Sequence, residues 1–148
     1  MANHLRRQIR EAVATAVTGL TTTGARVFQS RVYPLERTDL PGLLIYTADE
    51  TVEPSTIHEP AIIERTLRLR IVGVAKAVDD LDDVLDQIVK EVEIAIAGMS
   101  LTSLAEYVAL SDIAEPEYAR EVERPTGRVT MTFEAKYFTA ANAPDVAL

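Results

Sequence analysis

The sequence is 148 residues long, contains no cysteine and carries a formal net charge of -8 at pH 7. This length fits one domain with a sizeable core, and the lack of cysteine excludes disulfides and thiolate metal sites. The acidic charge argues against sequence-independent binding of nucleic acid, which needs a dense basic surface. No apolar run approaches the ~20 residues of a membrane span. We therefore expect a soluble, unexported protein that forms a single domain over residues 1–148.

The first elements that the sequence predicts are a helix and a strand. Apolar residues recur at helical spacing from Leu5 to Leu20, with Asn3 as the candidate N-cap. The arginines on the other face of this helix favour a solvated surface over a docking site for an acidic partner. Residues 25–32 are rich in β-favouring side chains, and Pro34 ends this strand because proline cannot donate to a ladder.

A buried strand and a long loop are predicted next. The continuous apolar run from Leu43 to Tyr46 is typical of a central strand that is buried on both faces. Residues 48–61 contain two prolines and four acids without any period, which predicts a loop. This loop either becomes ordered against another subunit or forms the tip of a hairpin.

Two later stretches, Ile63 to Ala75 and Arg128 to Tyr137, alternate apolar and polar residues. This is the period of a strand with one face on the core. The polar faces are suited to cross-strand pairing or to a subunit interface. We expect these polar faces to carry Arg65, Arg68 and Arg70 on the first strand and Arg128, Glu134 and Lys136 on the second.

A helix separates these two strands. It is predicted to open at Asp79 or Asp80 and to stop at Gly98, with an apolar stripe toward the core. Residues 101–108 are less periodic and are assigned to no element. Residues 117–122 are predicted to form the first strand of a hairpin whose turn is 123–127, and residues 139–148 are expected to be a flexible tail. The fold class is therefore α/β (α+β): a mixed, largely antiparallel sheet with two main helices on one face, plus a C-terminal β-hairpin.

Few residues suggest chemistry. Asp79, Asp80, Asp82 and Asp83 are the only carboxylates dense enough to suggest a site for Mg²⁺ or Ca²⁺. Acids in the first turn of a helix are favoured by its dipole, and this interpretation needs no metal. His4 and His58 have no neighbours at the spacing that zinc or nucleophilic chemistry requires. We expect no enzyme, and we assign no catalytic residue, cofactor or metal ligand.

The order of elements resembles that of the tail terminator proteins of long-tailed bacteriophages, the group typified by the minor tail protein U of lambda-like phages. The resemblance spans nearly the whole chain. It is carried by residues 24–28, by Leu40-Pro41 before the Leu43 to Tyr46 strand, and by the closing strand Val129 to Phe133 with Tyr137.

The resemblance implies a structural virion protein that is assembled in the host cytoplasm. Such a protein forms a homohexameric ring at the head-proximal end of the tail tube, stops tube polymerisation and provides the surface for the head connector. Its implied partners are its own copies, the tail tube protein and a head-tail connector or neck protein. No membrane and no direct sequence-specific contact with nucleic acid are implied, although DNA can pass through the ring.

A ring built head-to-tail needs two different, complementary surfaces on each subunit. Groups of opposite charge are the candidates for this subunit interface. Arginines of the polar strand face, Arg68 and Arg70, are expected to meet the acids of the neighbouring subunit's loop, Asp49, Glu50, Glu53 and Glu59.

Three alternatives to a tail terminator stay open at this point. The first is another head-tail junction protein, such as a neck or tail-completion protein. The second is a carboxylate-metal hydrolase or ligand-binding domain that uses Asp79, Asp80, Asp82 and Asp83. The third is a generic interaction domain.

Overall fold

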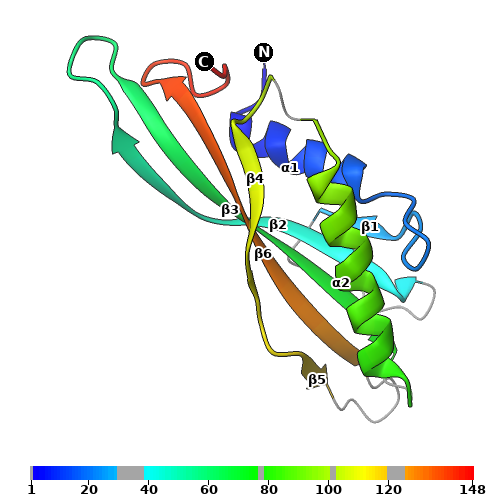
Figure 1. The fold of residues 1–148 in the computed structure, drawn as a ribbon. Helices are drawn as coiled ribbons and strands as arrows, with labels where there is room; N and C mark the ends of the chain where they lie inside the picture. Colours follow the sequence, from blue (N-terminus) through cyan, green and yellow to red (C-terminus); the bar gives the residue numbers. More distant parts are fainter. Residues whose placement is uncertain (1, 30–38, 77–78, 101–102, 120–125) are drawn as a thin grey trace.

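The computed structural model describes residues 2–29, 39–76, 79–100, 103–119 and 126–148. Within these ranges the chain forms two helices and a six-stranded sheet (Figure 1). In chain order the elements are α1 (Leu5–Ala16), β1 (Val27–Phe28), β2 (Gly42–Pro54), β3 (Ile62–Lys76), α2 (Leu81–Ala97), β4 (Tyr107–Ile113), β5 (Glu117–Ala119) and β6 (Thr126–Ala140).

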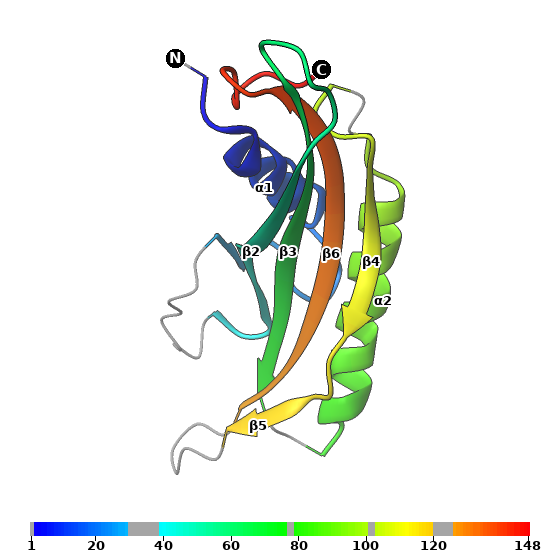
Figure 2. The same cartoon turned by 90° about the vertical axis from the view of Figure 1, so that its left-hand side faces the viewer.

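The sheet is mixed but largely antiparallel. Its strand order is β1-β2-β3-β6-β4, and β5 pairs with the start of β6. Only the pair β1–β2 among these described strands is parallel. Both helices pack on one face of the sheet, and Figure 2 shows the curved strands in front of them. The predicted α+β fold with two helices on one face is confirmed.

The alternating residues of the two long strands form the core. The helix-facing side chains of β3 and β6 are buried, whereas the polar residues between them lie on the other face. They pack against the apolar stripes of α1 and α2, so that removal of apolar surface from water holds the layers together. One buried face is as predicted for β6, whereas β3 is buried on both faces near its end, where Val72 and Val74 are also buried. The helix-facing buried residues of the two strands include Leu67, Leu69, Ile71, Val129, Met131, Phe133, Ala135 and Tyr137.

Helix α2 has the predicted limits, since Asp80 is its N-cap and Gly98 its C-cap. It packs closely on the sheet because glycines lie beneath it. A Cβ atom on Gly127 would lie 2.5 Å from Cδ2 of Leu81, and one on Gly73 would lie 2.8 Å from Cγ2 of Ile88. A side chain at either position would force Leu81 or Ile88, or the helix itself, to shift. No helix in the described ranges is long and apolar enough to cross a membrane.

The run from Leu43 to Tyr46 lies inside the sheet, between β1 and β3. Leu43 and Ile45 belong to the main core, whereas Leu44 packs with Val72 and Val74 in a small cluster on the opposite face. Burial on both faces is therefore confirmed. The strand lies one place in from the sheet edge rather than at the centre.

The predicted loop at residues 48–61 is largely wrong, because β2 continues to Pro54 and only residues 55–61 join it to β3. The outer part of β2 is exposed on both faces, so its residues show no alternation. The same reason explains why β4 was not assigned, since nearly all of its residues are exposed.

Other boundaries also differ. Helix α1 ends at Ala16, and its N-cap is His4 rather than Asn3, because Nδ1 of His4 accepts a hydrogen bond from the Arg6 amide at 3.1 Å. Of the predicted strand 25–32 only β1 is seen, and its remainder from residue 30 lies outside the described residues. In the C-terminal hairpin, β5 covers Glu117–Ala119 and pairs with β6 as expected, whereas residues 120–125 lie outside the described ranges.

The expected flexible tail is held against the body of the protein. Thr139 is fully buried and belongs to β6. After β6 the chain turns back, so that the Leu148 amide donates to the Phe138 carbonyl at 3.0 Å and the Leu5 amide donates to Pro144 at 3.1 Å. The two chain ends therefore meet beside the start of α1, as Figure 1 shows.

Candidate assembly surfaces

A long hairpin extends beyond the helices, and we call residues 49–66 the arm (Figure 1). It begins at a register shift between Thr47 and Glu50 of β2, which marks a β-bulge. Beyond the bulge, β2 pairs with β3, and β3 pairs in turn with the last residues of β6. Ile57, in the connection at its tip, is fully exposed. The arm is therefore placed to reach another molecule.

A buried polar cluster lies at the base of the arm. Nη1 of Arg65 lies 3.4 Å from Oε2 of Glu50, with 11% and 8% of the two side chains exposed. Nε of Arg65 donates to the Thr139 hydroxyl at 3.0 Å, and the Tyr137 hydroxyl donates to Glu50. The cluster therefore joins β2, β3 and β6 through side chains where the core ends.

Arg65 was wrongly predicted to lie on the outer, polar face of β3. It shares the inner face with Leu67, two residues further on, and its guanidinium lies 6.0 Å from the centre of the Tyr137 ring. The alternation of apolar and polar residues along this strand already places residue 65 on the same face as Leu67. The error came from grouping arginines by charge rather than by the strand period.

Burial and the hydrogen bond to Glu50 raise the pKa of Tyr137 above its ordinary value of 10.0. The hydroxyl therefore stays protonated, and able to donate, to a higher pH than that of an exposed tyrosine. Helix α1 also contacts the bulge, because Nη2 of Arg6 donates to the Ala48 carbonyl at 3.3 Å. Nε of Arg6 is buried without a hydrogen-bond partner among the described residues. Arg6 thus lies partly inside the protein, not on the fully solvated helix face that we expected.

The outer face of the sheet, which we define as the face away from the helices, carries ion pairs within the chain. Arg68 lies 3.0 Å from Asp49 and 3.6 Å from Glu134. Lys136 lies 2.8 Å from Glu64. Of the predicted interface residues, Arg68 thus meets Asp49 within the same subunit, and Glu50 is buried in the polar cluster.

The remaining predicted interface residues are Arg70, Glu53 and Glu59, and all three are exposed. Arg70 lies in β3 opposite Tyr46 and Thr132, whereas both acids lie on the arm. In the described part of the chain, none of the three has an ion pair or a side-chain hydrogen bond. The structure therefore separates the six predicted residues into three that are used internally and three that are free.

The four aspartates near the start of α2 are exposed and do not converge. Asp82 accepts a hydrogen bond from the Tyr118 hydroxyl at 2.6 Å, which joins β5 to the helix. No group of three or more potential metal ligands was found among the described residues. The metal-dependent alternative therefore has no site in this part of the chain. His4 caps α1, and His58 is exposed on the arm.

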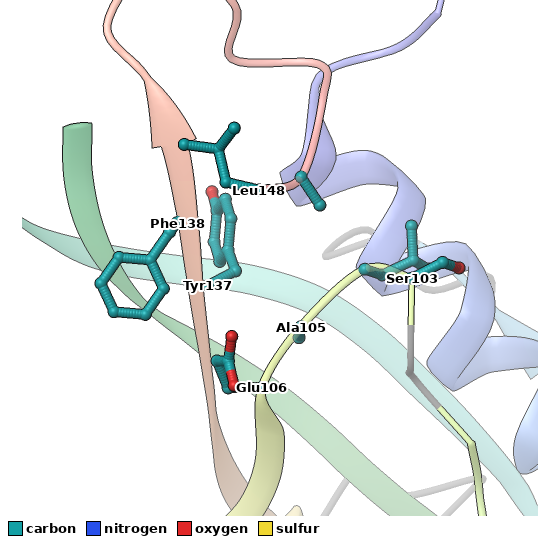
Figure 3. A pocket seen from close by; sticks show the side chains of 8 residues that line it. Ser103, Ala105, Glu106, Tyr137, Phe138 and Leu148 are labelled. Atoms are coloured by element: carbon teal, nitrogen blue, oxygen red, sulfur yellow. The ribbon is translucent and has the colours of Figure 1, made fainter. Parts of the chain in front are cut away.

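A surface hollow of about 500 Å³ lies beside the C-terminus (Figure 3). Leu148 and Tyr137 lie close together on one side of it, and Glu106 comes from the segment that leads into β4. The hydroxyl of Tyr137 is already bonded to Glu50. Ser103 and Glu106 both line this hollow, but no hydrogen bond joins their side chains in the described structure, and we assign no reaction to it.

The edge of the sheet formed by β4 was missed by sequence reasoning. Tyr107, Leu110 and Ile113 of this strand are partly exposed, and Ile94 of α2 is exposed beside it. A shallow, mostly apolar groove lies between α2 and β4. Tyr107 and Val108, which favour β-structure, were the available signal for a strand here.

Comparison with known proteins identifies the family. The family model of phage minor tail protein U matches residues 4–137. The chain belongs to this family. Membership places the protein among the structural components of phage tails, and hence in the virion. A chain in the structure titled "Virion of native gene transfer agent (GTA) particle" has 14% identity and a TM-score of 0.47, with 90% of each chain covered. The comparison with curated proteins gave no match.

Proposed function

We propose that this member of the minor tail protein U family is a tail terminator. In this role copies of the chain form a hexameric ring at the head-proximal end of the finished tail tube. The ring prevents further tube subunits from adding and provides the surface that the head connector or neck protein binds. The match to the family over residues 4–137 is the observation that carries this proposal.

The shape and charge of the subunit support it. The arm projects from the body and carries a fully exposed isoleucine, as expected of an element that is covered in an assembly. A net charge of -8 per subunit gives a ring that repels DNA phosphates, so that DNA can pass through the central hole without being held. No enzyme activity is part of this role.

The test is to add the purified protein to polymerising tail tubes of its own phage. We expect tubes to stop growing at a defined length and to carry a ring at one end in negative-stain images. Light scattering of the protein alone, across concentration and Mg²⁺, measures whether the ring also forms in solution. Tubes that grow without limit in its presence would contradict a terminator and favour another junction protein.

A further inference from the structure

The outer face of the sheet carries an unpaired cation near the middle of β3, and Lys76 at the end of this strand is also exposed without an ion pair in the described structure. Arg68, Arg128 and Lys136 on this face each lie within 3.2 Å of a carboxylate of the same chain. Arg70 is exposed near the middle of β3 and has no such partner among the described residues. An unpaired guanidinium that lies among paired charges can bind a carboxylate of another molecule.

The arm carries the opposite charge. Its other acids are paired within the chain: Asp49 with Arg68, Glu50 with Arg65 and Glu64 with Lys136. Glu53 and Glu59 are exposed and unpaired in the described structure. Glu53 also lies directly opposite Glu64 on β3, and like charges in this position repel. An approaching cation would relieve this repulsion.

These groups cannot meet within one subunit. Glu53 lies on the outer face at the level of Glu64, six residues along β3 from Arg70, which corresponds to about 20 Å. The two charges therefore belong to different surfaces of the same molecule. A closed ring of identical subunits needs such a pair of unlike, complementary surfaces.

Apolar side chains accompany the charges on both surfaces. On the arm, Ile57 is fully exposed between the two acids along the chain. On the sheet, Tyr46 is the cross-strand neighbour of Arg70 and belongs to the partly buried rim of the small cluster around Leu44. Exposed ion pairs contribute little by themselves, so a stable contact between these surfaces also needs burial of apolar area, which Ile57 and this rim can supply.

We propose that the arm of one subunit lies on the outer sheet face of the next copy in the ring, where Glu53 and Glu59 pair with Arg70. This inference rests on the proposed ring. It replaces the broader set of charged residues suggested by the sequence with the three that remain free.

The test uses two charge reversals, Arg70→Glu and the double variant Glu53→Lys/Glu59→Lys. Each alone places like charges on the two surfaces, so we expect loss of the ring at concentrations where the wild type forms it, alone or on tail tubes. In an equal mixture each subunit finds an opposite charge on both sides. We expect the mixture to recover rings in which the two variants alternate, three of each by native mass spectrometry.

Controls carry the same change in charge elsewhere. Lys90→Glu and Asp83→Lys/Asp86→Lys alter exposed residues of α2, and we expect both to form rings like the wild type. Circular dichroism checks that every variant is folded. If Arg70→Glu is not folded, Arg70→Gln takes its place and is expected to weaken the ring.

The outcomes separate this inference from the proposed function. Reversed variants that each form normal rings would overturn the arm contact and leave the terminator intact. Variants that lose the ring without recovery in the mixture would show that the two groups do not face each other. A wild-type protein that forms no ring, even on tubes, would overturn the terminator itself.

Discussion

The ion pair between Glu50 and Arg65 is the residue-scale feature with the largest expected energetic effect. Because it is buried, removing one partner leaves a charge without compensation, whereas replacing both with apolar side chains does not. We predict that Glu50→Leu and Arg65→Met each lower the free energy of unfolding by about 3–5 kcal/mol. The double variant should lose less than either single one.

Urea unfolding of the four proteins, compared as a double-mutant cycle, measures this coupling. All four must be in the same oligomeric state, so the measurements belong at concentrations where no ring forms. Single variants that unfold at the wild-type midpoint would mean that the pair is open to water in solution.

The candidate interface illustrates how far individual residues can be predicted. The sequence showed that Arg68, Arg70 and the acids of residues 49–59 have opposite charges. It could not show which of them meet within a chain, because that depends on the bulge after Thr47, which shifts the register by which β2 faces β3. Glu50 is buried only because the bulge turns it toward the helices.

At the scale of elements, the close packing of α2 on the sheet depends on Gly73 and Gly127. We predict that Gly127→Ala and Gly73→Ala each destabilise the protein by about 1–3 kcal/mol, because the added methyl overlaps Leu81 or Ile88. Gly98→Ala is the matched control. A Cβ there meets nothing closer than 3.5 Å and the backbone is already helical.

Thermal or urea unfolding distinguishes these variants. Equal stability of Gly127→Ala and Gly98→Ala would indicate that Leu81 or the helix can move aside at little cost, contrary to the tight packing described above.

Elements with one buried face were the ones that the sequence predicted well. The core-facing parts of β3 and β6, and α2, show a clear period because burial alternates along them. The outer half of β2 and most of β4 are exposed on both faces, so no alternation marks them. A single sequence says least about surface elements of this kind.

For the molecule as a whole, the net charge of -8 opposes association between copies. At about 10 mM ionic strength the screening length is about 30 Å and whole subunits repel, whereas at about 150 mM it is about 8 Å. Salt screens the attraction between opposite charges only a few ångströms apart much less than this repulsion between whole subunits. We predict that rings are favoured by raising the salt from about 10 to about 150 mM, as measured by light scattering.

A matched series with Mg²⁺ at constant ionic strength separates general screening from specific binding of the ion. Rings that weaken steadily over the same range of salt would mean that attraction between the charged surfaces outweighs the repulsion between whole subunits.

The register shift in β4, between Leu110 and Asp112, has a consequence for how free copies of the chain behave at high concentration. Strand edges with exposed apolar side chains invite stacking into fibres, and an interrupted edge resists it. We therefore expect free copies of the chain to resist joining edge to edge through β4 into extended sheets.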